Sequence, residues 1–184
     1  MKKRRFLAVF LVAMTLIAGG CTAFEQQPKP ETTSPKAPPI SPKPGEEALN
    51  VTLYFGDDQA MYLVPEKREV LTKGLSAPEI VVEELIRGPV DEKLTSVLPK
   101  ETKLISVSVA EGIAFVNLSK EAQTKHWGGS AGEMMTINSI VLSLTDLEGI
   151  KEVQFLIEGE KQEAIWGHTE TIEPIKPDKG VIKK

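Results

Sequence analysis

The sequence predicts an α+β domain in which two helices pack on one face of a mixed sheet. Segments with alternating apolar and polar residues come in pairs joined by short turns, which is typical of β-hairpins. Two longer segments carry apolar residues at helical spacing, and each follows a helix-start signal. The expected order is ββαββαβ(β), where the last strand is short. This order indicates a layered α+β fold in a single domain.

The first hairpin is expected between residues 49 and 71. Residues 49–55 alternate between apolar and polar side chains, which indicates a half-buried strand. Residues 56–58 (GDD) supply a turn, and residues 61–71 continue as the second strand. Pro65 lies inside that strand, and because proline cannot donate a main-chain hydrogen bond, we expect an edge position or a bulge there.

Two capping boxes mark the expected helices. Residues 76–79 (SAPE) combine an N-cap serine, an early proline and a glutamate three positions after the serine. This helix is expected to end at Arg87, because Gly88 and the proline after it stop a helix. Residues 130–133 (SAGE) form a second capping box, which starts a longer helix that runs up to Gly149.

A second hairpin and a further strand complete the predicted domain. Residues 105–109 alternate valine or isoleucine with serine, residues 111–112 supply a turn, and residues 113–118 return as a strand. After the second helix, residues 153–157 form another strand, and residues 171–175 are expected to add a short last one.

The N-terminus carries the pattern of a bacterial export signal. Residues 2–5 are all basic, residues 6–17 are apolar except for one threonine, and residues 18–20 are small. A basic region, a short apolar region and a small-residue cleavage site describe a secretory signal peptide, here residues 1–20. Twelve helical residues span only about 18 Å, which is too short for a membrane core of ~30 Å.

Cys21 indicates which kind of export signal this is. Residues 17–21 (IAGGC) resemble the bacterial lipobox, in which the cysteine is diacylated and becomes the first mature residue. Ala18 stands where the lipobox usually has a large aliphatic residue. Two acyl chains give stable membrane anchoring. We therefore expect an extracytoplasmic protein that is lipid-anchored through Cys21 to the outer face of the cell membrane.

The rest of the chain divides into a linker, one domain and a tail. Residues 21–47 contain seven of the 13 prolines and almost no large aliphatic side chains, so they read as an extended linker that buries too little apolar surface to fold. Residues 48–176 form the predicted domain. Residues 177–184 are expected to be a flexible Lys-rich tail.

Charge and cysteine content exclude several function classes. The chain has 22 basic and 26 acidic residues, and removing residues 1–20 takes away four basic and no acidic side chains, which leaves 18 against 26. An acidic protein without a basic patch is a poor nucleic-acid binder. Cys21 is the only cysteine, so neither an internal disulfide nor a cysteine-based metal site can form.

The sequence predicts no catalytic residue, metal site or cofactor. A serine–histidine–acid set could be drawn from Ser119 or Ser130, His126 and Asp146, but no G-x-S-x-G spacing supports it. The second histidine, His168, lies far along the chain, and no H-E-x-x-H, EF-hand or cysteine cluster accompanies either one.

Several residues are candidates for contact with a partner. The expected interaction residues are Trp127, Gly128, Gly129, Trp166 and His168. The two tryptophans could anchor a partner or pack in the core. The glycines before the second helix could offer N–H groups to an anion, but a loop that needs glycine's backbone freedom is the simpler interpretation. Asp57 and Asp58 are interpreted as turn residues.

Segments across the domain resemble the GerMN family, named for sporulation and spore germination proteins. In chain order they are residues 53–55 (LYF), 63–66 (LVPE) with Arg68, 84–89 (ELIRGP), 96–99 (SVLP), 115–119 (FVNLS), 128–130 (GGS) with Glu133, and 153–159 (VQFLIEG). The resemblance implies an envelope lipoprotein whose α+β fold is similar to the ring-building motifs of secretion and sporulation assemblies. It also implies protein–protein contacts, including self-association, and no established catalytic residues.

Two departures from the family pattern limit what the resemblance implies. Many members carry aspartate where this chain has Asn117, so no acid-dependent role is assigned there. Germination proteins of this type typically carry two such domains, and this chain has one. The resemblance therefore supports the domain family more than a specific germination role.

The leading hypothesis is a membrane-anchored extracytoplasmic lipoprotein with a non-catalytic GerMN-type interaction domain, acting in sporulation, germination or cell-envelope assembly. Its expected contacts are the membrane, through the diacylglyceryl cysteine, and a protein or peptidoglycan partner, but no nucleic acid. The alternative hypothesis is a cell-wall-directed hydrolase or an accessory subunit of one. A small-ligand receptor is a third interpretation, for which a single domain without a hinge is a poor frame.

Overall fold

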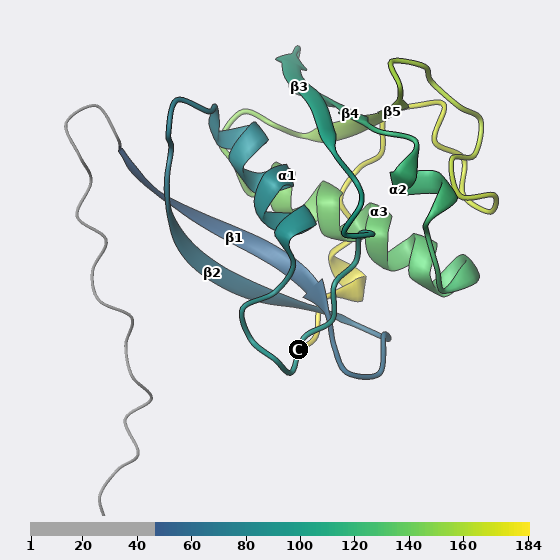
Figure 1. The fold of residues 1–184 in the computed structure, drawn as a ribbon, viewed down its shortest axis with the longest axis horizontal. Helices are drawn as coiled ribbons and strands as arrows, with labels where there is room; N and C mark the ends of the chain where they lie inside the picture. Colours follow the sequence, from purple (N-terminus) through teal and green to yellow (C-terminus); the bar gives the residue numbers. More distant parts are fainter. Residues whose placement is uncertain (1–46) are drawn as a thin grey trace, which may run out of the picture. The chain divides into compact units, whose positions relative to one another are not determined.

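The computed structural model describes residues 47–184, so the predicted signal peptide, Cys21 and almost all of the predicted linker lie outside the described residues. The elements in chain order are β1 (Ala48–Gly56), β2 (Leu63–Leu71), α1 (Ala77–Arg87), β3 (Leu104–Ala110), β4 (Ile113–Leu118), α2 (Glu121–Thr124), α3 (Gly129–Thr145), β5 (Glu152–Ile157) and the 3-10 helix η1 (Lys179–Val181). Strands and long helices follow the predicted order ββαββαβ, and α2 and η1 are short additions (Figure 1). The α+β class is confirmed. Among residues 47–184, no helix has the length and apolar character needed to span a membrane.

The strands divide between two sheets, which corrects the expectation of one mixed sheet. β1 and β2 form an antiparallel pair of their own. β3 and β4 form the second hairpin, and β5 pairs parallel with β4, which makes a mixed three-stranded sheet. The helices connect the two sheets. α3 contacts both β1 and β5, and α1 contacts both β1 and β3. Both sheets share one apolar core, in which Phe55 and Phe155 are fully buried.

α1 forms where the sequence predicts it, and its start is the predicted capping box. The Glu79 carboxylate accepts hydrogen bonds from the main-chain N–H of Ser76 (2.9 Å) and from its hydroxyl (2.6 Å). These bonds satisfy groups that a helix start leaves free. The helix ends at Arg87 because Gly88 has a φ of 90°, a conformation that glycine adopts at little cost.

The second predicted capping box is wrong. α3 begins at Gly129, after Gly128 in a left-handed conformation, so Ser130 lies inside the first turn instead of before it. The Glu133 side chain is fully buried and accepts hydrogen bonds from residues 168–169. The serine and glutamate thus have the spacing of a capping box without its contacts, because the Glu133 carboxylate bonds to the distant loop at residues 168–169 instead.

α3 lies along the edge of β1 that faces away from β2. Most of the helix is buried on all sides, as expected for a helix enclosed by other elements. The main-chain N–H of Tyr54 donates to Ser143 Oγ (3.0 Å), and the Ser139 hydroxyl donates to the Tyr54 carbonyl. Farther along the same edge, Gly56 and Thr95 exchange two main-chain hydrogen bonds (3.2 and 2.8 Å). These bonds satisfy edge groups that a neighbouring strand would otherwise take.

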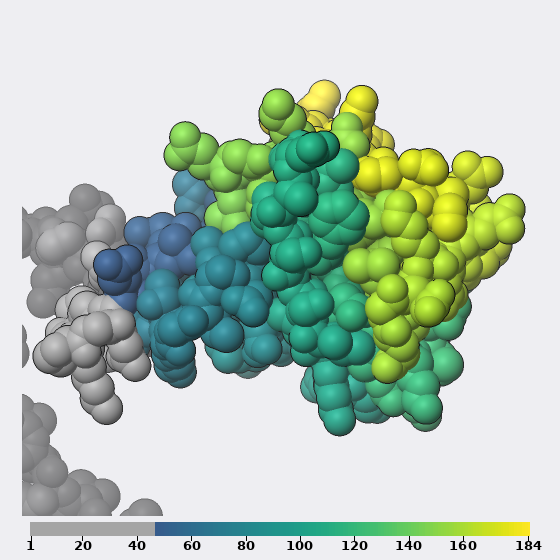
Figure 2. Space-filling view, turned by 90° about the horizontal axis from the view of Figure 1, so that it is seen from above, coloured from purple at the N-terminus to yellow at the C-terminus, as the bar shows by residue number. Residues whose placement is uncertain are grey.

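The segment after β5 packs against β5 and covers Gln154 on the outer face of that strand. Gln154 of β5 is fully buried, and its side-chain amide donates to the Thr171 carbonyl (2.9 Å). In Figure 2 this yellow-green segment lies beside the teal strands. The predicted strand at residues 171–175 is reduced to an isolated bridge between Ile175 and Val153, since Pro174 has no N–H to extend a ladder.

The Lys-rich end of the chain packs on the domain, which corrects the expectation of a flexible tail. Val181 and Ile182 pack against a buried apolar cluster that includes Leu63. The main-chain N–H of Lys183 donates to the Leu63 carbonyl (2.8 Å), and Lys183 Nζ lies 3.1 Å from Asp57 Oδ2. The C-terminus therefore lies beside the turn between β1 and β2 (Figure 1). Two aliphatic residues among the lysines are enough to dock the segment.

Candidate functional site

Four aromatic rings form a series from the core to the surface near the start of α3. Trp127 keeps half of its surface exposed (50%). The centroid of the His126 ring lies 6.0 Å from that of Trp127 and 5.4 Å from that of Trp166. Trp166 in turn meets Phe155 edge-on at 5.8 Å, and its indole N–H donates to the Ala122 carbonyl (2.8 Å). Trp166 is therefore mainly a packing residue, and Trp127 is the exposed end of the series.

The hydrogen bonds of His126 determine which ring nitrogen carries a proton. Nε2 lies 2.9 Å from Thr136 Oγ1, and that hydroxyl lies 2.5 Å from the Val97 carbonyl and 3.0 Å from the Gly132 carbonyl. Because a hydroxyl has one proton and gives it to a carbonyl, Nε2 must be the donor to Thr136. Burial lowers the pKa of His126, although the Glu133 charge acts in the opposite direction. The imidazole is therefore neutral near pH 7, with Nδ1 as an acceptor.

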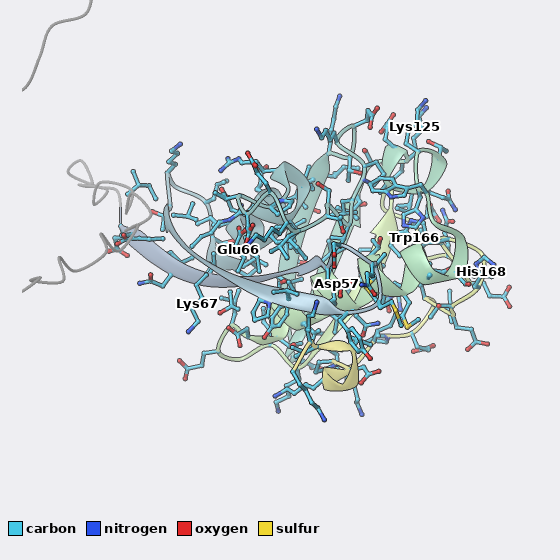
Figure 3. All side chains as sticks on the ribbon, turned by 90° about the horizontal axis from the view of Figure 1, so that it is seen from below. Asp57, Glu66, Lys67, Lys125, Trp166 and His168 are labelled. Carbon is cyan, nitrogen blue, oxygen red and sulfur yellow. The ribbon has the colours of Figure 1, made fainter. Side chains whose placement is uncertain are left out.

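A buried carboxylate holds the loop that carries His168. The Glu133 oxygens accept hydrogen bonds from the main-chain N–H groups of His168 (3.1 Å) and Thr169 (2.6 Å) and lie 2.8 Å from His168 Nδ1. Burial raises the pKa of Glu133, but these hydrogen bonds, led by that of Thr169, lower it by more. The His168 ring remains largely exposed, at the same end of the domain as Trp166 (Figure 3). Glu133 thus positions a loop beside the aromatic residues.

Glycine is needed around Trp127 for two geometric reasons. Gly128 and Gly129 both have positive φ, 90° and 56°, a region that other residues rarely adopt. A Cβ on Gly132 would lie only 2.2 Å from the Trp127 carbonyl oxygen. The glycines therefore let the chain reverse closely against α3, which favours the conformational interpretation over an anion site.

Trp127 borders a hollow of about 170 Å³ between segments that are distant in the sequence. The lining includes Gly56, Ala60, Thr95, Val97 and Met135. Sites for drug-sized ligands usually measure about 300–1,000 Å³, so this hollow suits a single side chain or a small group. An exposed indole at the rim of a small hollow is typical of a contact surface, and it does not favour the small-ligand receptor.

The geometry does not assemble the serine–histidine–acid set. His126 precedes α3 and Asp146 follows it, and the 17 residues of the helix span about 25 Å at 1.5 Å each. Ser119 Oγ accepts a hydrogen bond from the main-chain N–H of Lys103 (3.0 Å), and none of the hydrogen bonds found within residues 47–184 joins it or Ser130 to His126. In the same part of the chain, no three acidic or histidine side chains are grouped so as to hold a metal ion.

Three charged residues in the segments that resemble the GerMN family form a clamp between β2 and the end of α1. They are Glu66, Arg68 and Glu84. Arg68 forms ion pairs with Glu84 (2.7 Å) and Glu66 (2.5 Å) and donates to the Gly88 carbonyl (2.6 Å). Glu66 also accepts a hydrogen bond from the main-chain N–H of Val90 (3.0 Å). The side chains of the arginine and both glutamates are almost fully buried. These residues fix the loop after α1, and no local sequence pattern indicates this role.

The side chains of Asn117, in β4, and of Asp57, after β1, each stabilise a turn. Asn117 Oδ1 accepts a hydrogen bond from the main-chain N–H of Gly159 (2.8 Å), and an aspartate could accept the same bond, which explains why both residues suit this position. Asp57 Oδ1 accepts a bond from the Met61 N–H (2.9 Å), and this bond, helped by the Lys183 charge, lowers the pKa of Asp57 below its usual value. The turn interpretation of Asp57 is confirmed.

Sequence reasoning missed two members of the site. The sequence places Glu133 at a helix start and offers His126 as a catalytic base or a metal ligand, and neither role is the one that the structure shows. A sequence signal exists only for the histidine, which stands directly beside one of two tryptophans. The partners of both residues lie about 35 to 40 positions away along the chain, so no local pattern identifies them.

A family comparison settles the relationship. The sequence model of the family Germane, described as "Sporulation and spore germination", matches residues 52–163. The chain belongs to the Germane family. No match is found among curated proteins.

Three solved structures are similar to this Germane domain. The first GerMN domain of the sporulation protein GerM from Bacillus subtilis has a TM-score of 0.59 and 22% identity, over 72% of this chain and 98% of that one. The tandem GerMN domains of GerM give 0.61 and 20%, over 81% of this chain and 51% of that one, so this chain spans about half of the tandem. A candidate lipoprotein from Clostridium perfringens gives 0.51 and 26%, over 70% and 87%. These matches confirm the GerMN resemblance and the fold.

Proposed function

We propose that the protein is an extracytoplasmic lipoprotein whose Germane domain is a non-catalytic interaction module of the cell envelope, acting in sporulation, germination or envelope assembly. Residues 1–20 direct export, Cys21 carries the lipid, and residues 22–47 present the domain. The signal-peptide pattern, the lipobox and the candidate lipoprotein among the similar structures support this proposal.

The observation that carries the binding role is the half-exposed Trp127 beside a small hollow. Indole side chains at contact surfaces often contribute most of the binding free energy, because a rigid ring excludes much water when it is covered. Trp127 stacks on a neutral histidine and directly precedes the glycine turn at residues 128–129. The side chain is thus held outward before a protein or peptidoglycan partner arrives, which lowers the entropic cost of binding.

The non-catalytic role rests on how the reactive groups are used. Glu133 accepts three hydrogen bonds and has no exposed surface. His126 Nε2 is occupied by Thr136. These groups maintain the shape of the loops, so we expect no turnover of cell-wall material.

Two variants of the full-length protein test the two halves of the proposal in the native envelope. Cys21→Ala should move the protein from the membrane pellet to the soluble fraction. Trp127→Ala should stay in the membrane but lose about tenfold or more of its retention on isolated envelope partners, as expected for a central anchor. Val109→Ala is the matched control, because Val109 is similarly exposed (46%) but lies on β3.

Three results would contradict the proposal. The first is a Cys21→Ala protein that remains in the membrane pellet. The second is equal retention of the Trp127→Ala and Val109→Ala proteins. The third is release of soluble fragments from purified peptidoglycan by the wild-type protein, which would support a hydrolase instead.

A further inference from the structure

The main-chain hydrogen bonds of β2 alternate between its two edges. At one end of the hairpin the Asp57 N–H donates to the Tyr62 carbonyl (2.9 Å), and at the other end the Thr72 N–H donates to the Glu47 carbonyl (2.9 Å). Alternate residues of an antiparallel strand bond to the partner strand. The even-numbered residues of β2 therefore bond to β1, and the odd-numbered residues direct their N–H and carbonyl groups to the outer edge.

Within residues 47–184, part of this outer edge has main-chain groups without hydrogen-bond partners. The residues concerned are Lys67, Glu69 and Leu71. None of the hydrogen bonds found within residues 47–184 reaches their outward N–H or carbonyl groups. A strand edge in this state is a ready template for another extended chain.

The same edge already receives one extended segment of this chain. Near the start of β2, Leu63 forms a parallel bridge with Ile182, and its carbonyl accepts a hydrogen bond from the Lys183 N–H (2.8 Å). Pro65, the next outward residue, has no N–H and ends this pairing. From Lys67 onward, no other segment of residues 47–184 pairs with the edge. Addition of a peptide strand to a free edge is a common mode of recognition.

A hollow of about 390 Å³ lies beside the open part of the edge. Its lining includes Arg68, Val70, Leu75, Ile80, Glu83 and Arg87, from β2, α1 and the segment between them. Its volume lies within the usual range for ligand sites, about 300–1,000 Å³. Leu75 and Val90 are 42% and 75% exposed there. The hollow therefore offers exposed apolar surface next to main-chain groups that pair with nothing else in the described part of the chain.

We propose that an extended segment of a protein partner adds to β2 as a third strand between Lys67 and Leu71. Five residues at about 3.3 Å each give a contact of roughly 16 Å. Side chains alternate across a strand, as Glu66 and Lys67 do in Figure 3, so the partner residues opposite Arg68 and Val70 face the hollow and are aliphatic. The residue opposite Glu69 is basic, and the residue opposite Lys67 is acidic, because opposite charges across strands are stabilising.

A second copy of this chain is a poor occupant of the edge. If two copies paired antiparallel about a two-fold axis at the centre of this segment, each Glu69 would lie directly opposite the other. Like charges in that position are destabilising. Exposed Lys67 and Glu69 also disfavour uncontrolled edge-to-edge pairing. The site therefore selects a segment with complementary charges.

Two labelled heptapeptides test the proposal on the full-length protein in detergent micelles. Their central residues are Glu-Val-Lys-Val-Leu for parallel addition and Leu-Val-Lys-Val-Glu for antiparallel addition. The control peptide Val-Glu-Leu-Lys-Val places the charges at the inward positions. Fluorescence anisotropy should show binding of one test peptide and not of the control. Glu69→Pro should weaken that binding about tenfold, because it removes one outward N–H, and Glu69→Gln, which keeps the N–H, should change it less than about threefold.

Amide hydrogen exchange on the unmodified protein gives an independent readout. Saturation with the bound peptide should slow exchange at Lys67, Glu69 and Leu71 about tenfold, so the test holds even if Glu69→Pro does not fold. The proposal is overturned if neither peptide binds, if the control peptide binds equally, or if protection appears elsewhere. Protection of the same amides by dimer formation without peptide would also overturn it, because a second copy would then be the occupant.

Discussion

Arg68 joins β2 to the end of α1, and its replacement tests how the domain is held together. The side chain is 9% exposed, and its two carboxylate partners are similarly buried, at 5% exposure for Glu84 and 13% for Glu66. The guanidinium carbon also lies 5.2 Å from the centroid of the Phe55 ring. Arg68→Met keeps most of the apolar stem and removes every charged contact.

The magnitude follows from the charges left behind. Removing one partner of a buried ion pair costs about 3–5 kcal/mol, because the other charge loses its compensation. Glu66 keeps the main-chain N–H groups of Val90 (3.0 Å) and Asp91 (2.9 Å), and Glu84 keeps the ion pair with Arg87. We therefore expect the lower end of the range, about 3 kcal/mol, or a loss of roughly 10 °C in Tm.

The assay is urea unfolding followed by tryptophan fluorescence and circular dichroism. Lys176→Met is the matched control, because Lys176 is 80% exposed and lies 3.6 Å from Glu152. An exposed pair of this kind contributes about 0–1 kcal/mol. If Arg68→Met lowers the free energy of unfolding by no more than Lys176→Met does, the clamp does not stabilise the domain and the reasoning is refuted.

Three further predictions concern the loops around the site. Gly132→Ala should lower stability by about 1–3 kcal/mol and shift the Trp127 emission, because the new Cβ meets the Trp127 carbonyl; an unchanged spectrum and Tm would argue against the close contact. Asn117→Ala should cost about 1 kcal/mol in urea unfolding, and Asn117→Asp should cost much less, since aspartate still accepts the bond from Gly159; equal losses would contradict this. The pKa of Glu133 is lower in the folded state than its usual 4.5, so its contribution to stability is present above about pH 4.5 and is lost as pH falls through the lowered value. Glu133→Gln should therefore flatten the acid side of the Tm profile between about pH 2 and 5, and a profile parallel to wild type would count against this assignment.

The elements of this fold could be predicted because their signals are local. The capping box at residues 76–79 and the alternation in residues 49–55 act within a few residues, and both appear in the structure as predicted. The division into two sheets could not be predicted, because it depends on Ser139 and Ser143 bonding to Tyr54 more than 80 positions away. Local sequence patterns predict the strands and helices, whereas hydrogen bonds between distant residues determine how these elements are arranged in two sheets.

The candidate site shows the same limit. Composition and neighbouring glycines indicate Trp127, Trp166 and His168 as candidates, and the structure places all three at one end of the domain. Their separate roles could not be predicted, since Trp166 packs against Phe155 while Trp127 stays exposed. That difference depends on the loop after β5, which no local pattern positions.

The measurement that tests the central claim most directly is site-specific photo-crosslinking in the native envelope. Benzoylphenylalanine replaces Trp127 in one full-length protein and Val109, a similarly exposed residue on β3, in another. The account predicts a discrete crosslinked product from position 127 that disappears when Cys21→Ala is added, and no such product from position 109. A lack of product at 127, or the same product from both positions, would contradict the claim that this lipid-anchored domain meets its partner through Trp127.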